Sequence, residues 1–131
     1  MKQYLLDTCI IVDYLRKNKK AALLLSSLEK PLISVITAAE VYQGCRNKKE
    51  LNEVKKALRF FNIIPINEAI SQLSLELLEK HTLSFGLLIL DSLIAATAIK
   101  NNLTLITANF KHFKMIKTLK LEKWLPSSPG R

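Results

Sequence analysis

Short apolar runs alternate with amphipathic stretches along this chain, and the alternation restricts the folds that are open to it. Buried strands are predicted at 3–7, 31–35, 103–107 and near 118–121, with a further extended segment at 62–66. Helical patterns lie between them, at 8–15, 21–28, 37–44, 47–61, 67–79 and 87–100. Strands that alternate with helices form a parallel sheet with helices on both faces. The sequence therefore predicts an α/β fold with a doubly wound, mainly parallel sheet of four to five strands.

The length and composition of the chain predict one globular domain. Its 131 residues are 49% hydrophobic, which is enough to build a core. We find no internal repeat, so we expect residues 1–131 to form a single domain with a disordered tail at 126–131. Asp7 interrupts the apolar core that a signal peptide needs, and Asp91 and Lys100 interrupt the longest apolar stretch. We therefore expect a soluble, cytoplasmic protein that does not enter a membrane.

The charge of the chain is strongly unbalanced. Lys and Arg number 20 against 11 Asp and Glu, which gives a formal net charge of +9. Such an excess favours a polyanionic partner, and nucleic acid is the first candidate. The alternative is a solvated, lysine-rich surface without a partner. Lysines recur at every third position from 111 to 123, a period that fits neither a strand nor a helix, so we expect most of them to be solvated.

Three carboxylates contrast with this basic background because each lies against an apolar run. They are Asp7 in YLLDTCII, Glu40 in SVITAAEVY and Asp91 in LLILDSLIAA. An ionised carboxylate is costly to bury without a partner. If the fold brings the three together they repel one another, and a hard cation such as Mg²⁺ or Mn²⁺ relieves that repulsion. The sequence therefore suggests an acidic metal site in a basic protein.

The predicted sheet gives these residues a common location. Ligands of open parallel sheets bind at the carboxyl ends of the strands. Asp7 ends the first predicted strand, while Thr107 and Asn109 stand at the end of the strand at 103–107. Thr8 and Thr107 place hydroxyl groups beside Asp7 and Asn109, where they can orient a ligand or a water molecule.

Each carboxylate also has a purely structural interpretation. Asp7 can cap the helix that begins at Thr8. Glu40 follows Thr37 by three residues, so that T-A-A-E is a possible capping box. Asp91 lies within a helix that we expect to be central and buried, where an unpartnered carboxylate is expensive. We favour the functional interpretation because the three occur together with the polar residues of the same rim.

The motifs resemble those of the PIN-domain family, and most of all its small, free-standing VapC-type toxins. The resemblance rests on four segments in register, which are LLDTCIIVDYL, ISVITAAEVYQG, LDSLIAATAI and LITANFKHF. It implies a three-layer PIN-like fold and a metal-dependent endoribonuclease. It also implies that Asp7, Glu40 and Asp91 are catalytic and hold Mg²⁺ or Mn²⁺, with Asn109 at the fourth, more variable position.

The resemblance implies partners as well. Toxins of this type cut RNA, form homodimers and are neutralised by a cognate antitoxin protein. A homodimer also agrees with the helices predicted at 21–28 and 47–61, because their apolar stripes exceed what one small sheet can cover.

One departure from the family pattern keeps a second hypothesis open. Relatives often carry an acid three residues after the Asn109 position, whereas this chain has His112. Fewer carboxylates bind a second metal ion less tightly. The alternative to a nuclease is therefore a catalytically inactive PIN-like module that binds RNA or protein.

Overall fold

The computed structural model describes residues 2–125, so the tail expected at 126–131 lies outside the described residues. Within this range the strands are β1 (Tyr4–Leu6), β2 (Leu32–Ser34), β3 (Asn62–Ile64), β4 (Thr104–Thr107) and β5 (Lys120–Lys123). The helices are α1 (Thr8–Leu15), α2 (Lys19–Ser27), α3 (Val35–Gln43), α4 (Lys48–Leu58), α5 (Glu68–Phe85), α6 (Ile89–Lys100) and α7 (Phe110–Phe113).

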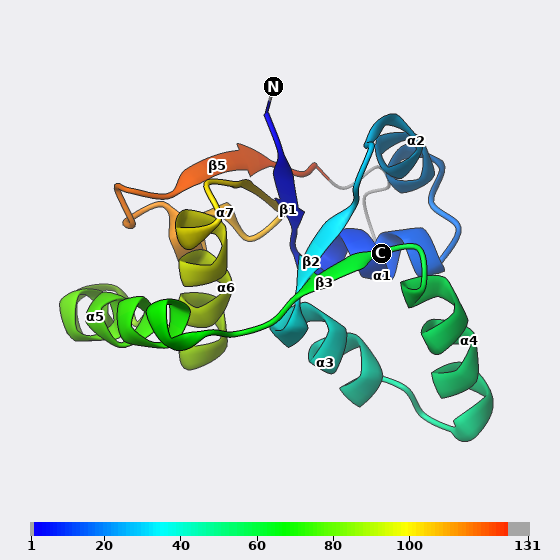
Figure 1. Cartoon of the computed structure of the whole chain (residues 1–131), viewed down its shortest axis with the longest axis horizontal. Coiled ribbons are helices and arrows are strands. Elements are labelled where there is room, and N and C mark those ends of the chain that lie inside the picture. Colours follow the sequence, from blue (N-terminus) through cyan, green and yellow to red (C-terminus); the bar gives the residue numbers. More distant parts are fainter. Residues whose placement is uncertain (1, 126–131) are drawn as a thin grey trace.

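The five strands form one sheet in which every neighbouring pair is parallel. Their order is β3-β2-β1-β4-β5, so β1 is central and pairs with β2 on one side and β4 on the other (Figure 1). The predicted α/β class and the doubly wound sheet are confirmed, with five strands in the described residues. In such a sheet the chain changes direction at the central strand, and the carboxyl ends of the strands beside it form a natural ligand site.

Helices cover both faces of the sheet. Leu5 and Leu6 are adjacent in β1 but belong to different hydrophobic clusters, because successive side chains of a strand point to opposite faces. The cluster around Leu5 includes buried residues of α5, α6 and α7. The cluster around Leu6 includes buried residues of α1, α2, α3 and α4. Figure 1 shows α5 and α6 on one side of the strands and α1, α2 and α4 on the other.

Helix α5 is longer than the sequence pattern predicts. The expected helix at 67–79 begins correctly, because the Asn67 side chain accepts a hydrogen bond from the Ile70 N–H and caps it. It continues to Phe85 instead of giving way to a loop at 84–86. The turn that ends it is made by Gly86, which has a φ of 68°. Glycine adopts this left-handed conformation without steric cost, so Gly86 is the effective stop signal.

The helix that carries Asp91 is buried over most of its length but not at its beginning. Ala95, Ala96 and Ala98 are fully buried, as expected of a central helix. Leu88 and Ile89, in contrast, are 64% and 65% exposed at its N-terminal end. The expectation that the whole 87–100 stretch is buried is therefore wrong for its first turn, and Asp91 lies at the boundary between surface and core.

Spare apolar surface is found on α5, at the start of α6 and, as expected, on α2, where Leu23 is 70% exposed, but it is not found on α4. Val54 and Leu58 of α4 are buried, so this helix does not carry the excess apolar stripe that we expected. The exposed large hydrophobic residues between positions 75 and 90 are Leu75, Leu83, Phe85, Leu88, Ile89 and Leu90. Among the residues that the structure describes, no helix is both long and apolar enough to cross a membrane.

Candidate metal and nuclease site

Asp7 lies at the carboxyl end of the central strand and is fixed there by hydrogen bonds of its backbone N–H and of both carboxylate oxygens. Its N–H donates to the Ile106 carbonyl at 3.0 Å, which ties it to β4. Its Oδ1 accepts from the Thr8 N–H at 2.8 Å, so Asp7 caps α1 as the structural interpretation proposed. Its Oδ2 accepts from the Thr107 hydroxyl at 2.6 Å. Capping thus occupies only one carboxylate oxygen, and the second faces the end of β4.

Burial makes the charge of Asp7 unfavourable. The residue is 5% exposed, and this burial raises the pKa of its carboxyl group above the usual value. The hydrogen bonds from Thr107 and Thr8, and the nearby His112, oppose that rise in pKa. None of the ion pairs formed by residues 2–125 includes Asp7. A bound cation would therefore favour the ionised form.

Glu40 lies on α3 and reaches the same region through Thr8. Helix α3 begins before Thr37, and its cap is Ser34, whose side chain accepts from the Thr37 N–H at 3.1 Å. The alternative of a capping box at 37–40 is therefore wrong, because Thr37 is already inside the helix. Glu40 Oε1 instead accepts a 2.5 Å hydrogen bond from the Thr8 hydroxyl. One residue, Thr8, thus contacts both Asp7 and Glu40.

Asp91 faces the site from the first turn of α6. Its side chain is 23% exposed, and partial burial raises its pKa. The negative charges of Asp7 and Glu40 raise it further, whereas His112 lowers it. The Nδ1 atom of His112 lies 3.4 Å from Asp91 Oδ2. The fold therefore brings Asp91 near enough to Asp7 and Glu40 for their charges to repel its own, and it places His112 against Asp91.

Asn109 is connected to the site through its backbone. Its N–H donates to the Thr107 hydroxyl oxygen at 2.9 Å, and the same hydroxyl donates to Asp7. Although Asn109 precedes α7, its side chain makes no capping hydrogen bond. The exposed amide is thus available at the rim.

These residues fit a divalent cation in chemistry, though they do not form a closed cage. Carboxylate and amide oxygens are the ligands that Mg²⁺ and Mn²⁺ prefer, and the repulsion acting on Asp91 is what a cation would relieve. Within the described residues, however, no three side chains of the Asp, Glu, His and Cys types lie close enough to hold one ion as they stand. Asp7 Oδ2 and Glu40 Oε1 instead accept hydrogen bonds from the Thr107 and Thr8 hydroxyls.

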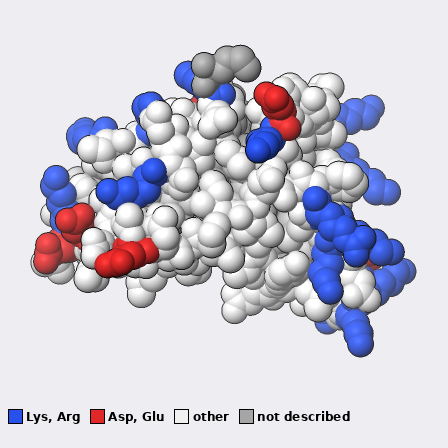
Figure 2. All heavy atoms as spheres, in the orientation of Figure 1, with Lys and Arg blue, Asp and Glu red and all other residues white. Residues whose placement is uncertain are grey.

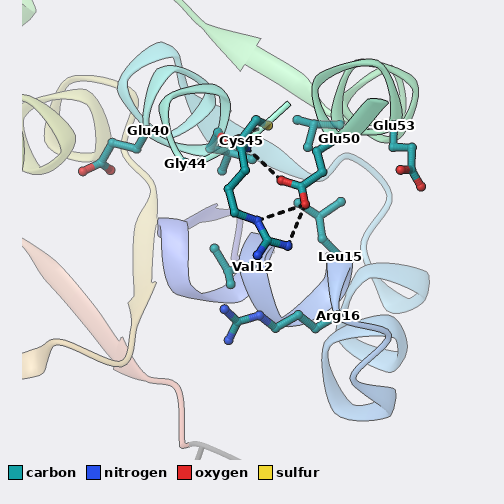
Figure 3. A pocket seen from close by; sticks show the side chains of 11 residues that line it. Val12, Leu15, Arg16, Glu40, Gly44, Cys45, Glu50 and Glu53 are labelled. Atoms are coloured by element: carbon teal, nitrogen blue, oxygen red, sulfur yellow. Dashed lines mark hydrogen bonds and ion pairs between the residues drawn. The ribbon is translucent and has the colours of Figure 1, made fainter. Parts of the chain in front are cut away.

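Two hollows flank the carboxylates, and they differ in charge. The first, which we call the mixed hollow, has a volume of about 670 Å³ and lies between α1, α3 and α4 (Figure 3). Glu40 lies at its margin, and Arg16 and Arg46 line it. The Arg46 guanidinium donates to Glu50 at 2.8 Å, so its charge is already paired. Figure 3 shows the Glu40 carboxylate pointing away from that ion pair.

The second hollow lies on the other side of the site, at the end of β4 and β5. It has a volume of about 540 Å³ and shares Asn109 and His112 with the site. We call it the basic hollow, and its lining residues are Ala108, Asn109, Phe110, Lys111, His112, Lys114, Lys123, Trp124 and Leu125.

Sequence reasoning did not identify two parts of this arrangement. Thr37 is fully buried one helical turn before Glu40, and its hydroxyl lies 3.4 Å from that of Thr8. Its spacing of three from Glu40 is the available signal in the sequence, but the same spacing also fits a helix cap. The period of three among the lysines did not predict that some of them meet at the basic hollow, because it fits neither a helix nor a strand and the chain reverses after α7.

Comparisons with known proteins agree with this architecture. The PIN domain family model matches residues 4–117. The ribonuclease VapC10 of Mycobacterium tuberculosis is 36% identical over 120 residues, covering 88% of this chain and 90% of that protein. The crystal structure of VapBC2 from Rickettsia felis bound to a promoter DNA fragment contains a chain that is 32% identical, with a TM-score of 0.77, 93% coverage of this chain and 98% of that one. A toxin–antitoxin complex from Klebsiella pneumoniae matches with 32% identity and a TM-score of 0.75, covering 89% and 95% of the two chains. The chain belongs to the PIN-domain family.

Proposed function

We propose that this protein is a divalent-metal-dependent endoribonuclease that acts as the toxin of a toxin–antitoxin pair. The observation that supports it most is the position of Asp7, Glu40 and Asp91 around the carboxyl ends of the central strands in a chain of the PIN-domain family. Relatives with this family's fold include a protein named as a ribonuclease and a chain from a toxin–antitoxin complex.

In this proposal the three carboxylates hold Mg²⁺ or Mn²⁺. A bound ion of this kind makes a water molecule nucleophilic and neutralises charge on the phosphate. Thr107 and Thr8 hold the Asp7 and Glu40 side chains in place through their hydrogen bonds. Asn109, at the exposed rim, offers an amide to the ion or to the substrate. The +9 charge of the chain favours RNA as the substrate that approaches this acidic centre.

The proposal includes its partners and its location. A cognate antitoxin protein is expected to block the site, since similar chains are found in VapBC complexes. We further propose a homodimer, a single catalytic domain spanning 1–131 and a cytoplasmic location. The exposed apolar residues of α5 and α6 offer the surface for the second copy.

One observation favours the alternative of an inactive binding module. Among the residues described, no three potential ligands converge on one point, which is the arrangement expected if metal binding had been lost. The two hypotheses differ in a single assay. Metal-free protein should be mixed with single-stranded and structured RNA, in EDTA and with added Mg²⁺ or Mn²⁺.

The nuclease hypothesis predicts cleavage that is absent in EDTA and restored by either ion in excess. If the protein binds RNA but does not cut it in EDTA, Mg²⁺ or Mn²⁺, the inactive binding module is the correct interpretation. Full cleavage in EDTA would contradict both the proposed metal and the roles given to the carboxylates.

A further inference from the structure

The basic hollow brings together lysines that are spread through the C-terminal part of the sequence. Lys111 and Lys114 come from α7 and the residue after it, and Lys123 ends β5. Lys120 lies at the other end of β5, where its Nζ donates to Asn102 Oδ1 at 2.9 Å. Because the chain turns between α7 and β5, three lysines of the series line the same hollow, whereas Lys117 and Lys120 lie outside its lining.

Sheet pairing fixes the hollow next to the carboxylates. Lys123 pairs in register with Thr107, and the Trp124 N–H donates to the Thr107 carbonyl at 2.9 Å. Adjacent parallel strands are about 4.8 Å apart. Because the Thr107 side chain bonds to Asp7, the backbone of Lys123 is one strand away from the residue that holds the central carboxylate.

The three lysines that line the hollow have no acidic ion-pair partner among the described residues. None of the ion pairs found in residues 2–125 includes Lys111, Lys114 or Lys123. No residue among those that line the hollow is acidic. The Lys123 ammonium lies 5.0 Å from the centre of the Phe110 ring, a cation–π contact that holds it beside the hollow.

The mixed hollow is less suited to binding a polyanion. Its lining has three carboxylates, Glu40, Glu50 and Glu53, against two arginines, Arg16 and Arg46, of which Arg46 is already paired with Glu50. A nucleic acid strand that crosses the carboxylates thus meets uncompensated lysines on one side and carboxylates on the other.

We propose that the basic hollow binds the phosphate backbone of single-stranded RNA directly beside the bond that is cut. This proposal rests on the proposed nuclease function and assigns a substrate subsite to it. Lys111, Lys114 and Lys123 contact successive phosphates, and Phe110 positions Lys123. A concave basic surface that follows the backbone without reading bases is the usual way in which proteins hold single strands.

The test compares two triple variants with the same loss of charge. The first is Lys111→Ala/Lys114→Ala/Lys123→Ala. The control is Lys48→Ala/Lys55→Ala/Lys56→Ala on α4, where Lys and Arg side chains gather on the face seen in Figure 2. Affinity for a fluorescent single-stranded RNA is measured by anisotropy in EDTA at 50 to 200 mM salt, so that no cleavage occurs.

The subsite predicts that the first variant binds at least 10-fold more weakly and that the control changes less than 3-fold. Each lost phosphate contact lowers the slope of log affinity against log salt by about 0.7, so the slope should fall by roughly 2. A Lys→Arg triple at positions 111, 114 and 123 should bind as the wild type does, because it keeps the charges. Equal losses in both alanine triples would show only diffuse attraction, and either that result or an unchanged affinity would overturn the proposal.

Cleavage by the same variants separates this proposal from the nuclease proposal. If the wild type cuts RNA, the first alanine triple should show a raised KM with kcat retained at saturating RNA. A wild type that cuts RNA with no effect of the triple on KM or affinity would remove the subsite and leave the nuclease. If the wild type does not cut RNA but the first alanine triple still binds RNA 10-fold more weakly, the nuclease proposal fails and the basic hollow stands as an RNA-binding surface.

Discussion

The Thr107 hydroxyl donates a 2.6 Å hydrogen bond to Asp7 Oδ2 and accepts the N–H of Asn109 at 2.9 Å. Thr107 is fully buried, so neither bond is exchanged easily with water. One hydroxyl therefore connects the ends of β1 and β4 with the start of α7. It positions the central carboxylate and also satisfies a backbone N–H at the rim.

This relationship makes Thr107→Val informative, because valine has the shape of threonine without the hydroxyl. The variant leaves the Asn109 N–H without its acceptor and Asp7 with one donor fewer. We expect it to lose about 1–3 kcal/mol of unfolding free energy, measured by urea denaturation. Thr107→Ser keeps the hydroxyl and should restore the Asp7 bond, at the cost only of a lost methyl group. A Thr107→Val variant as stable as the wild type would mean that the hydroxyl has no structural role.

The catalytic role of the carboxylates is tested by Asp91→Asn. The substitution keeps the size of the side chain but removes a charge proposed to hold the metal, so single-turnover RNA cleavage should fall at least 100-fold. Glu79→Gln on α5 removes one exposed charge away from the site and should retain full cleavage. Circular dichroism should show the same fold for both variants. Wild-type rates in Asp91→Asn would exclude Asp91 from the chemistry.

The same substitution has an opposite effect on stability. Burial, with the charges of Asp7 and Glu40, raises the pKa of Asp91. The folded state therefore favours the protonated form of Asp91. This preference stabilises the protein fully at a pH below 3.8, the usual pKa of the group. The stabilisation is lost as the pH rises through the higher pKa of the folded state. At pH 7 in EDTA the charge costs stability, so Asp91→Asn should unfold at a higher temperature, by roughly 2–5 °C.

The pH dependence provides the control for that experiment. The advantage of Asp91→Asn should shrink as pH is lowered toward 3.8, where the wild-type carboxyl also becomes neutral. Added Mg²⁺ should raise the melting temperature of the wild type more than that of the variant, because a ligand stabilises only a form that binds it. A variant that is less stable than the wild type at pH 7 without metal would contradict the inferred repulsion.

The parallel sheet was predictable from the sequence, since buried strands and amphipathic helices leave local patterns. Local patterns also mark Asp7, Glu40 and Asp91, whose shared role in a metal site stays a prediction. Asp7 follows a buried strand, and Asp91 interrupts an apolar helix. Two features depended on tertiary contacts and were not predictable in this way. Ser34, and not Thr37, caps α3, and only the packed structure shows that the Thr8 hydroxyl bonds to Glu40. The lysines of the basic hollow meet because the chain reverses after α7, and neither a helical nor a strand pattern in the sequence predicts that contact.

The proposed dimer interface is located by the leucine side chains that stay exposed in the packed structure, which helical periodicity alone does not reveal. Leu83 of α5 is 99% exposed. Leu88, which directly precedes α6 and its Asp91, is 64% exposed. A charge placed there should oppose burial against a second copy, so Leu83→Glu/Leu88→Glu should be monomeric by light scattering where the wild type is dimeric. Leu23→Glu on α2 changes an equally apolar residue, 70% exposed, on another face and should leave the dimer intact. Dissociation by Leu23→Glu alone would place the interface on α2.

His112 tests how much negative charge the site requires. It stands where the resemblance to the PIN-domain family leads us to expect an acid, and its Nδ1 lies 3.4 Å from Asp91 Oδ2. His112→Asp adds an oxygen ligand and a negative charge beside Asp91, so the proposed site should bind Mg²⁺ more tightly. The Mg²⁺ concentration for half-maximal cleavage should fall at least 3-fold, and calorimetric titration of Mg²⁺ without RNA should show the same change. His112→Asn, which adds an amide oxygen without charge, should shift the midpoint much less. Equal midpoints for wild type and His112→Asp would show that His112 lies outside the metal's coordination sphere.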